Sequence, residues 1–178
     1  MHIKLAAAVG VALAGAVGFG GTAGPAAAQS EEEIEAREIA AVGTAKVGLA
    51  EAIAAAEKQL GGKVAAGGLE VDADRLFYEL LVGKDGRFTS ARVDPTTGAV
   101  GQAGEASLEP GKAVSPQDAR IDLAQAVRLA EEASGRKALE AGVEPRAGAA
   151  VYVVEVVEDD EVSVHRVDPM SGAVSGED

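Results

Sequence analysis

Few side chains in this sequence have the types that catalysis needs. The chain of 178 residues contains no cysteine, which excludes thiol nucleophiles, disulfides and thiolate zinc sites. A catalytic imidazole needs an orienting partner, and no pattern of hydroxyl and base surrounds His165, so we interpret it as a structural strand residue. Motifs of serine hydrolases, zinc peptidases and nucleotide-binding proteins are absent. The sequence predicts a protein that is not an enzyme and has neither catalytic nor cofactor-binding residues.

Two acidic clusters supply oxygen atoms that could bind Ca²⁺. One contains Asp72 and Asp74, and the other is the run at residues 158–161. Neither has the ligand spacing of a calcium loop, so we interpret both as solvated acidic turns and predict no metal site. Any Ca²⁺ binding should be weak and diffuse, which calorimetric titration would test.

The charge balance restricts the partners of the chain. Lys and Arg number 16 against 29 Asp and Glu, which gives a net charge of −13. Sequence-independent nucleic-acid binding needs clustered cations, and aromatic residues for base stacking make up only 3% of the chain. We therefore expect no nucleic-acid partner. The hydrophobic fraction of 47% argues for a folded protein.

Residues 1–28 have the pattern of a secretory signal peptide. Lys4 precedes an apolar run at residues 5–19, and three alanines at residues 26–28 offer a cleavage site. An uncleaved anchor is the alternative, since residues 5–28 carry no charge, but frequent glycine makes that stretch a poor spanning helix. We expect a mature chain beginning at Gln29, exported to the periplasm or secreted, without stable membrane insertion.

The sequence contains an internal repeat. A shift of 74 positions aligns residues 45–101 with residues 119–175 without a gap, and 21 of the 57 aligned pairs are identical. Such self-similarity indicates a duplicated structural unit. Residues 102–118, rich in Gly, Pro and Ser, are expected to form a linker, and residues 176–178 a short acidic tail.

Periodicity predicts the elements of each repeat. Apolar residues recur at helical spacing from Leu49 to Leu60 and from Leu123 to Ala130, so each repeat should open with a helix. In the N-terminal segment, residues 29–44, we expect a short exposed helix at residues 31–42.

Strands are predicted at residues 76–82 and 88–93, and again at 151–157 and 162–167. Residues 63–71 are ambiguous between helix and strand. If Val82 pairs with Phe88, the helix covers the face with Tyr78, Leu80 and Val82, and the opposite face remains apolar. The proposed register places these residues on the uncovered face: Phe77, Leu81, Ala91, Val93, Val151, Val153 and Val167. We take Phe77, Leu81, Val151 and Val153 as the candidate interface.

A turn with the same chemistry closes both repeats. An aspartate accepts backbone N–H groups, a proline sets φ near −65°, and a glycine adopts a positive φ. These structural residues are Asp94, Pro95, Gly98, Asp168, Pro169 and Gly172.

These motifs resemble the PepSY domain, in two copies. The residues that carry this resemblance are Leu49, Ala52, Ile53 and Ala56, then Tyr78, then residues 93–100. The same pattern recurs 74 positions later. The resemblance implies one helix packed on a three-stranded antiparallel sheet, with residues 63–71 as the first strand. It also implies an exported protein that restrains peptidases and has no catalytic residue in its pattern.

The sequence thus predicts an α+β protein of two tandem units, each with one helix on a three-stranded antiparallel sheet. The units should dock, because each is too small to be stable alone, with the uncovered sheet faces forming the contact or the partner site. We expect an exported, non-catalytic protein-interaction module whose partner is an extracytoplasmic peptidase or another envelope protein. The alternative is a low-affinity divalent-cation binder or envelope sensor.

Overall fold

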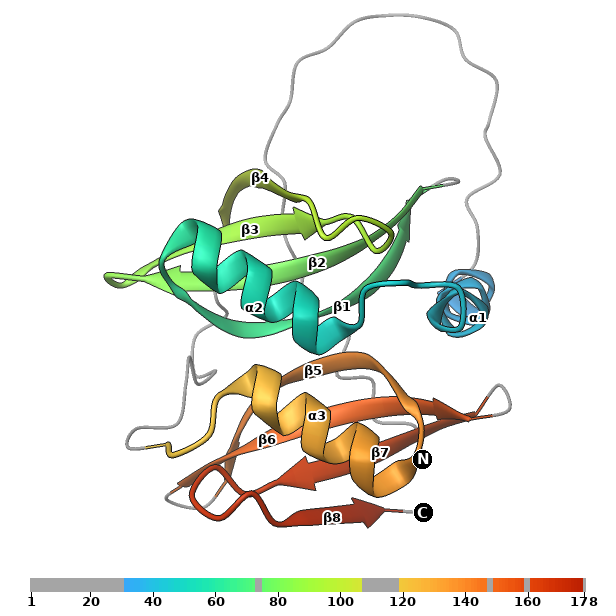
Figure 1. Ribbon diagram of the computed structural model, residues 1–178, viewed down its shortest axis with the longest axis vertical. Coiled ribbons are helices and arrows are strands. Elements are labelled where there is room, and N and C mark those ends of the chain that lie inside the picture. Colours follow the sequence, from blue (N-terminus) through green and yellow to red (C-terminus); the bar gives the residue numbers. More distant parts are fainter. Residues whose placement is uncertain (1–30, 73–74, 107–118, 147–148, 159–160, 178) are drawn as a thin grey trace, which may run out of the picture.

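The computed structural model describes residues 31–72, 75–106, 119–146, 149–158 and 161–177. The fold belongs to the α+β class, as predicted. Its eight antiparallel strands form a single sheet (Figure 1). The elements are α1 (Glu31–Val42), α2 (Leu49–Leu60), β1 (Lys63–Asp72), β2 (Arg75–Lys84), β3 (Arg87–Val93), β4 (Val100–Ala106), α3 (Leu123–Ser134), β5 (Lys137–Arg146), β6 (Ala149–Glu158), β7 (Glu161–Val167) and β8 (Val174–Glu177). The expected signal peptide lies outside the described residues.

Each repeat contributes four strands rather than three. The additional strands are β4 and β8, which pair with β3 and β7 after the turn that closes each repeat. Residues 102–106 therefore belong to the sheet and not to the expected linker, and residues 176–177 belong to β8 and not to a free tail. The ambiguous stretch at residues 63–71 is strand β1.

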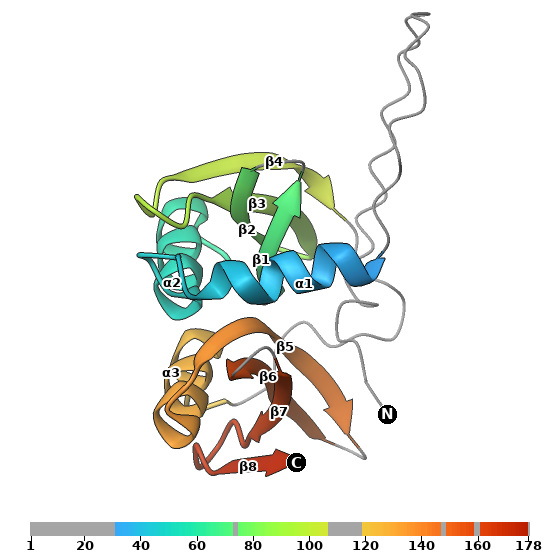
Figure 2. The same ribbon diagram turned by 90° about the vertical axis from the view of Figure 1, so that its right-hand side faces the viewer.

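The two repeats join into one body through their central strands. The strand order is β4-β3-β2-β1-β5-β6-β7-β8, so β1 and β5 form the seam. Helices α2 and α3 contact each other and cover the same face of the sheet (Figures 1 and 2). The expected docking is confirmed, but strand edges and helices make the contact, whereas we expected the uncovered sheet faces to make it.

Local capping fixes both repeat helices. The Asp122 carboxylate accepts a hydrogen bond from the Gln125 N–H at 2.8 Å and so caps α3. Gly48 precedes α2 and has no side chain to cap it, but its N–H donates to the Glu51 carboxylate at 3.0 Å. Gly61 and Gly135 end the helices in the left-handed conformation, with φ of 67° and 72°.

The predicted register of the β2–β3 hairpin is wrong by one residue. Asp85 and Gly86 both have positive φ and form a two-residue turn, so Lys84 pairs with Arg87 and Val82 pairs with Thr89 rather than with Phe88. The β6–β7 hairpin has the equivalent register. As a result, three residues that we expected on the uncovered face lie in the helix-covered core: Ala91, Val93 and Val167.

One hydrophobic core spans both repeats. It contains the buried residues of α2 and α3 together with alternate residues of the strands beneath them. The Tyr78 hydroxyl donates a hydrogen bond to the Val47 carbonyl at 2.8 Å, and the Tyr152 hydroxyl donates to the Ile121 carbonyl at 2.9 Å. Burial, followed by the nearby charges of Glu131 and Glu51, raises the pKa of Tyr78 to about 12. Each tyrosine thus ties the start of a helix to the sheet.

Helix α1 has the predicted bounds but is not simply exposed. Its last residue, Val42, is 5% exposed and belongs to the core, and Ile39 and Ala41 pack against that core. The helix contacts β1 and β5 and lies across the junction between the two halves (Figure 2). It therefore covers one end of the seam.

Candidate functional site

The face of the sheet opposite α2 and α3, here called the back face, carries all four residues of the candidate interface. Phe77 and Leu81 alternate along β2 with the core residues Tyr78 and Leu80, and Val151 and Val153 alternate with the core residue Tyr152 along β6. The side chains differ in exposure, however. Leu81 is 3% exposed and Val153 is 1% exposed, whereas Phe77 and Val151 are half-buried.

Small residues at the seam explain the buried pair. Ala66 of β1 lies between Leu81 and Gly142 in the register, and Gly142 in turn pairs with Val153. These four positions form one continuous row across β2, β1, β5 and β6. Leu81 and Val153 are therefore structural residues of the seam, and Phe77 and Val151 are the members of the candidate interface that a partner could reach.

A charged group covers the aromatic ring of Phe77. The Arg92 guanidinium lies over this ring, with Cζ 4.2 Å from the ring centroid. The neighbouring Glu79 carboxylate accepts a hydrogen bond from the Ser90 hydroxyl at 2.7 Å, and Ser90 is itself buried. The back face is thus a mixed surface, with apolar side chains set among paired charges, and not the simple apolar face that we expected.

Carboxylates gather where α1 meets the back face. Glu70 remains exposed as a whole residue, yet desolvation of its carboxyl group raises its pKa to about 7, with further contributions from the charges of Glu38 and Glu79 and a hydrogen bond with Glu38. Arg92 acts in the opposite direction. One carboxylate of this group belongs to α1, so the group couples α1 to the sheet.

This coupling predicts that stability depends on pH. Between about pH 4.5 and about 7, the folded state holds a proton on Glu70 that the unfolded state has lost, so the free energy of unfolding should fall as pH rises through this range. Glu70→Gln should remove much of the fall, measured by urea unfolding at pH 4.5, 6 and 8. Glu132→Gln, at an exposed position of α3, is the control and should retain the wild-type slope. Equal slopes in both variants would contradict the prediction.

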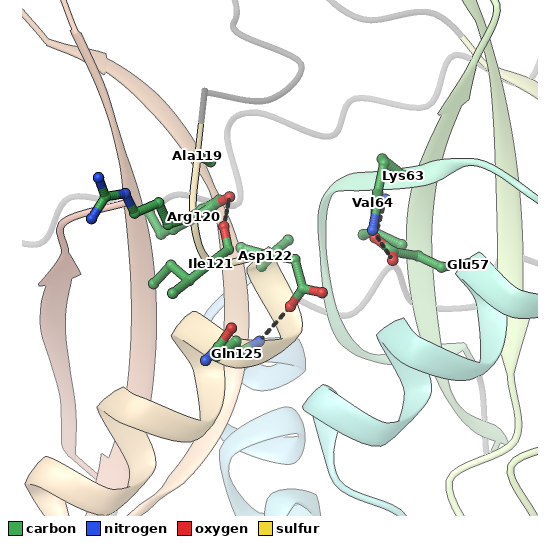
Figure 3. Close-up of a pocket in the computed structure, with 10 residues that line it drawn as sticks. Glu57, Lys63, Val64, Ala119, Arg120, Ile121, Asp122 and Gln125 are labelled. Carbon is green, nitrogen blue, oxygen red and sulfur yellow. Dashed lines mark hydrogen bonds and ion pairs between the residues drawn. The ribbon is translucent and has the colours of Figure 1, made fainter. Parts of the chain in front are cut away.

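A pocket of about 350 Å³ lies between the two halves (Figure 3). The Glu57 carboxylate accepts hydrogen bonds from the Val64 N–H at 3.0 Å and from the Lys63 ammonium at 2.7 Å. Asp122 and Gln125 approach from the start of α3. The hydrogen bond to Glu57 is the largest influence on Lys63 and raises the pKa of this lysine.

The turn residues have structural roles. The Asp94 carboxylate accepts hydrogen bonds from the backbone N–H groups of Thr96 and Thr97, both at 2.8 Å, and these bonds lower its pKa. The Pro95 carbonyl accepts the N–H groups of the segment that enters α2. Asp168 and Pro169 repeat this arrangement before α3, and Gly98 and Gly172 adopt positive φ.

His165 and parts of the two acidic clusters fall within the described residues. Within them, no group of three or more His, Asp or Glu side chains is arranged to hold a metal ion. His165 is half-buried in β7, where it pairs with Val154 and Gly176. In the acidic clusters, residues 73–74 and 159–160 lie outside the described part of the chain, and Glu158 forms an ion pair with Arg136.

Sequence reasoning missed two features of the site. The first is the pairing of Arg92 with Phe77, which depends on the correct hairpin register. The second is the pocket at the junction, although a signal for it was present: Glu57 and Lys63 recur as Glu131 and Lys137 in the second repeat. Only the seam brings Glu57 and Lys63 close to Asp122 of the other half.

A comparison with family models decides the relationship. The model described as "Peptidase propeptide and YPEB domain" matches residues 46–100 and 120–178. The chain belongs to the PepSY family. The two matched segments agree with tandem PepSY-like repeats.

A solved structure is similar to this chain. It is a crystal structure of a presumed lipoprotein from Clostridium difficile 630, with 17% sequence identity and a TM-score of 0.45, and the match covers 75% of this chain and 95% of that chain. The comparison with curated proteins finds no match. Across the described residues, no helix has the length and apolar character needed to span a bilayer.

Proposed function

We propose that this PepSY protein is an exported, non-catalytic binding module that lowers the activity of an extracytoplasmic peptidase. The family relationship supports the peptidase as the partner class, and the signal-like N-terminal sequence supports export. The observation that carries the proposal is the fusion of two PepSY-like repeats into one sheet. This fusion leaves a single back face that both repeats share and that neither α2 nor α3 covers.

The accessible part of this face has properties of a recognition surface. Phe77 and Val151 are half-buried apolar side chains, and Arg92 adds a cation held against an aromatic ring. Aromatic residues and arginine are enriched at protein interfaces, where they supply buried area and directional hydrogen bonds. The partner therefore contacts a mixed surface and not a purely hydrophobic one.

An activity assay tests this function. Purified residues 29–178 are added in increasing concentration to the exported peptidases of the source cells, and hydrolysis of fluorescent casein is followed. We expect a saturable decrease in rate, and at least about a tenfold loss of potency for Phe77→Asp, as for a hot-spot residue. Glu132→Ala, on the opposite side of the molecule, should retain full potency. An unchanged rate with the wild-type chain, or equal potency of all variants, would contradict the proposal.

A further inference from the structure

The four central strands carry a row of carboxylates on the back face. Residues that lie directly opposite each other on neighbouring strands share one face of a sheet. The pairing therefore brings Glu79 of β2, Gly68 of β1, Glu140 of β5 and Glu155 of β6 into one row across the seam. Neighbouring strands lie roughly 4.8 Å apart, so the row extends over about 14 Å. Three of its four positions are glutamates, and none is basic.

Each accessible apolar residue of the candidate interface also lies beside a glutamate. Phe77 pairs with Glu70 of β1, and Val151 pairs with Glu144 of β5. The repeat shift of 74 positions carries one pair onto the other, so both repeats present an apolar side chain next to a carboxylate. Of the five glutamates in the row and in these two pairs, Glu155 alone is buried, with 8% exposed. A partner can therefore reach the other four.

Two arginines border this surface but do not balance its charge. Arg92 of β3 pairs with Glu79, and Arg166 of β7 lies at the opposite border. Burial of its carboxyl group, followed by the charges of Glu38 and Glu79, raises the pKa of Glu70 to about 7, although Arg92 acts in the opposite direction. The carboxylates therefore repel one another here, and a cation brought to the surface would be attracted.

We propose that the back face binds a basic segment of a partner protein, in which lysine or arginine side chains alternate with apolar side chains. The basic side chains lie over the row of glutamates, and the apolar ones pack against Phe77 and Val151. Complementary charge of this kind gives an interface its specificity and a fast association rate. In the described part of the chain no three acidic side chains converge on a metal site, so the spread carboxylates suit several separate cations.

This inference rests on the proposed function, because it names the chemistry that the peptidase presents to the back face. Its test uses a peptide instead of a peptidase. A short fluorescein-labelled peptide with alternating lysine and leucine is titrated into the purified chain of residues 29–178, and anisotropy is measured. We expect saturable binding of this peptide. A peptide of the same length with glutamate in place of lysine should not bind.

Substitutions in the row locate the binding surface. Glu79→Gln combined with Glu140→Gln should weaken binding about three- to tenfold, the effect of two partly exposed charge pairs. Glutamine at position 79 keeps an oxygen that can accept the Ser90 hydroxyl hydrogen bond. The control is Asp85→Asn combined with Glu132→Gln, which removes the same charge from exposed positions in the β2–β3 turn and on α3. The control should bind the peptide as the wild-type chain does.

Glu144→Gln provides a second, single variant on β5 and should weaken binding about two- to threefold. Equal affinity of the control and of both back-face variants would show that the peptide responds only to the overall negative charge, which would overturn the inference. Absence of saturable binding would also overturn it. If the peptide did not bind while the chain still inhibited the peptidases and Phe77→Asp still reduced that inhibition, the basic segment would be wrong and the proposed function would stand.

Discussion

Gly67→Ala is expected to destabilise the protein by roughly 2–5 kcal/mol, the combined effect of backbone strain and overpacking. Gly67 lies at the centre of the seam with φ of 158°, and an added Cβ atom would meet the Glu79 carbonyl and lie 2.8 Å from the Leu80 Cα. Both neighbours are backbone atoms of β2 and cannot move aside without disturbing its pairing. Urea unfolding monitored by circular dichroism measures the loss.

Gly104 is the matched control, because alanine there would meet the backbone strain without the steric overlap. Gly104 of β4 has a similar φ of 153°, but a Cβ atom there would meet nothing within 4 Å. We expect Gly104→Ala to lower the free energy of unfolding by about 1 kcal/mol, the strain alone. If both variants lost the same free energy of unfolding, the close contact between Gly67 of β1 and the backbone of β2 would be contradicted.

Leu81→Asp is expected to lower the free energy of unfolding by roughly 3 kcal/mol or more. Leu81 is 3% exposed and pairs with Ala66 and Ser90, so the new carboxylate would be buried without a cation at either paired position. The measurement is again urea unfolding, at pH 7.

Phe77→Asp is the matched control for this prediction. Phe77 lies on the same strand and the same face but is half-buried, and the new carboxylate would lie beside Arg92. We expect a loss of about 1 kcal/mol, from partial loss of apolar burial. If both variants lost a similarly small free energy of unfolding, Leu81 would be an accessible interface residue, and its assignment to the seam would be wrong.

Much of the fold follows from the sequence because its signals are local. The apolar stripe from Leu49 to Leu60 specifies a helix, and it is α2 with these same bounds. The turn chemistry at Asp94 and Asp168 acts within five residues, and the observed hydrogen bonds agree with it. The repeat shift of 74 positions predicted that both halves would share one plan, which the strand order confirms.

The predictions of hairpin register and of the contact between repeats were wrong, because both depend on contacts that sequence periodicity does not encode. The register prediction relied on collecting valines on one face, whereas the Asp85–Gly86 turn sets the register and places Ala91 and Thr89 on the core side. The seam escaped prediction because it forms between two edge strands of separate repeats. Its position depends on small residues such as Gly68, where an added Cβ atom would lie 2.9 Å from the Leu139 carbonyl of β5, a contact that exists only once β1 and β5 are side by side.

The two repeats form one unit, with a continuous sheet and contacting helices. The chain lacks cysteine, so Lys58→Cys in α2 and Glu132→Cys in α3 allow two nitroxide labels to be placed at exposed positions without other changes. Double electron–electron resonance then measures the distance distribution between them. We predict one narrow distribution, because α2 and α3 contact each other above a continuous sheet. A broad distribution, as from two domains that move independently, would show that the two repeats are not held together by the β1–β5 seam.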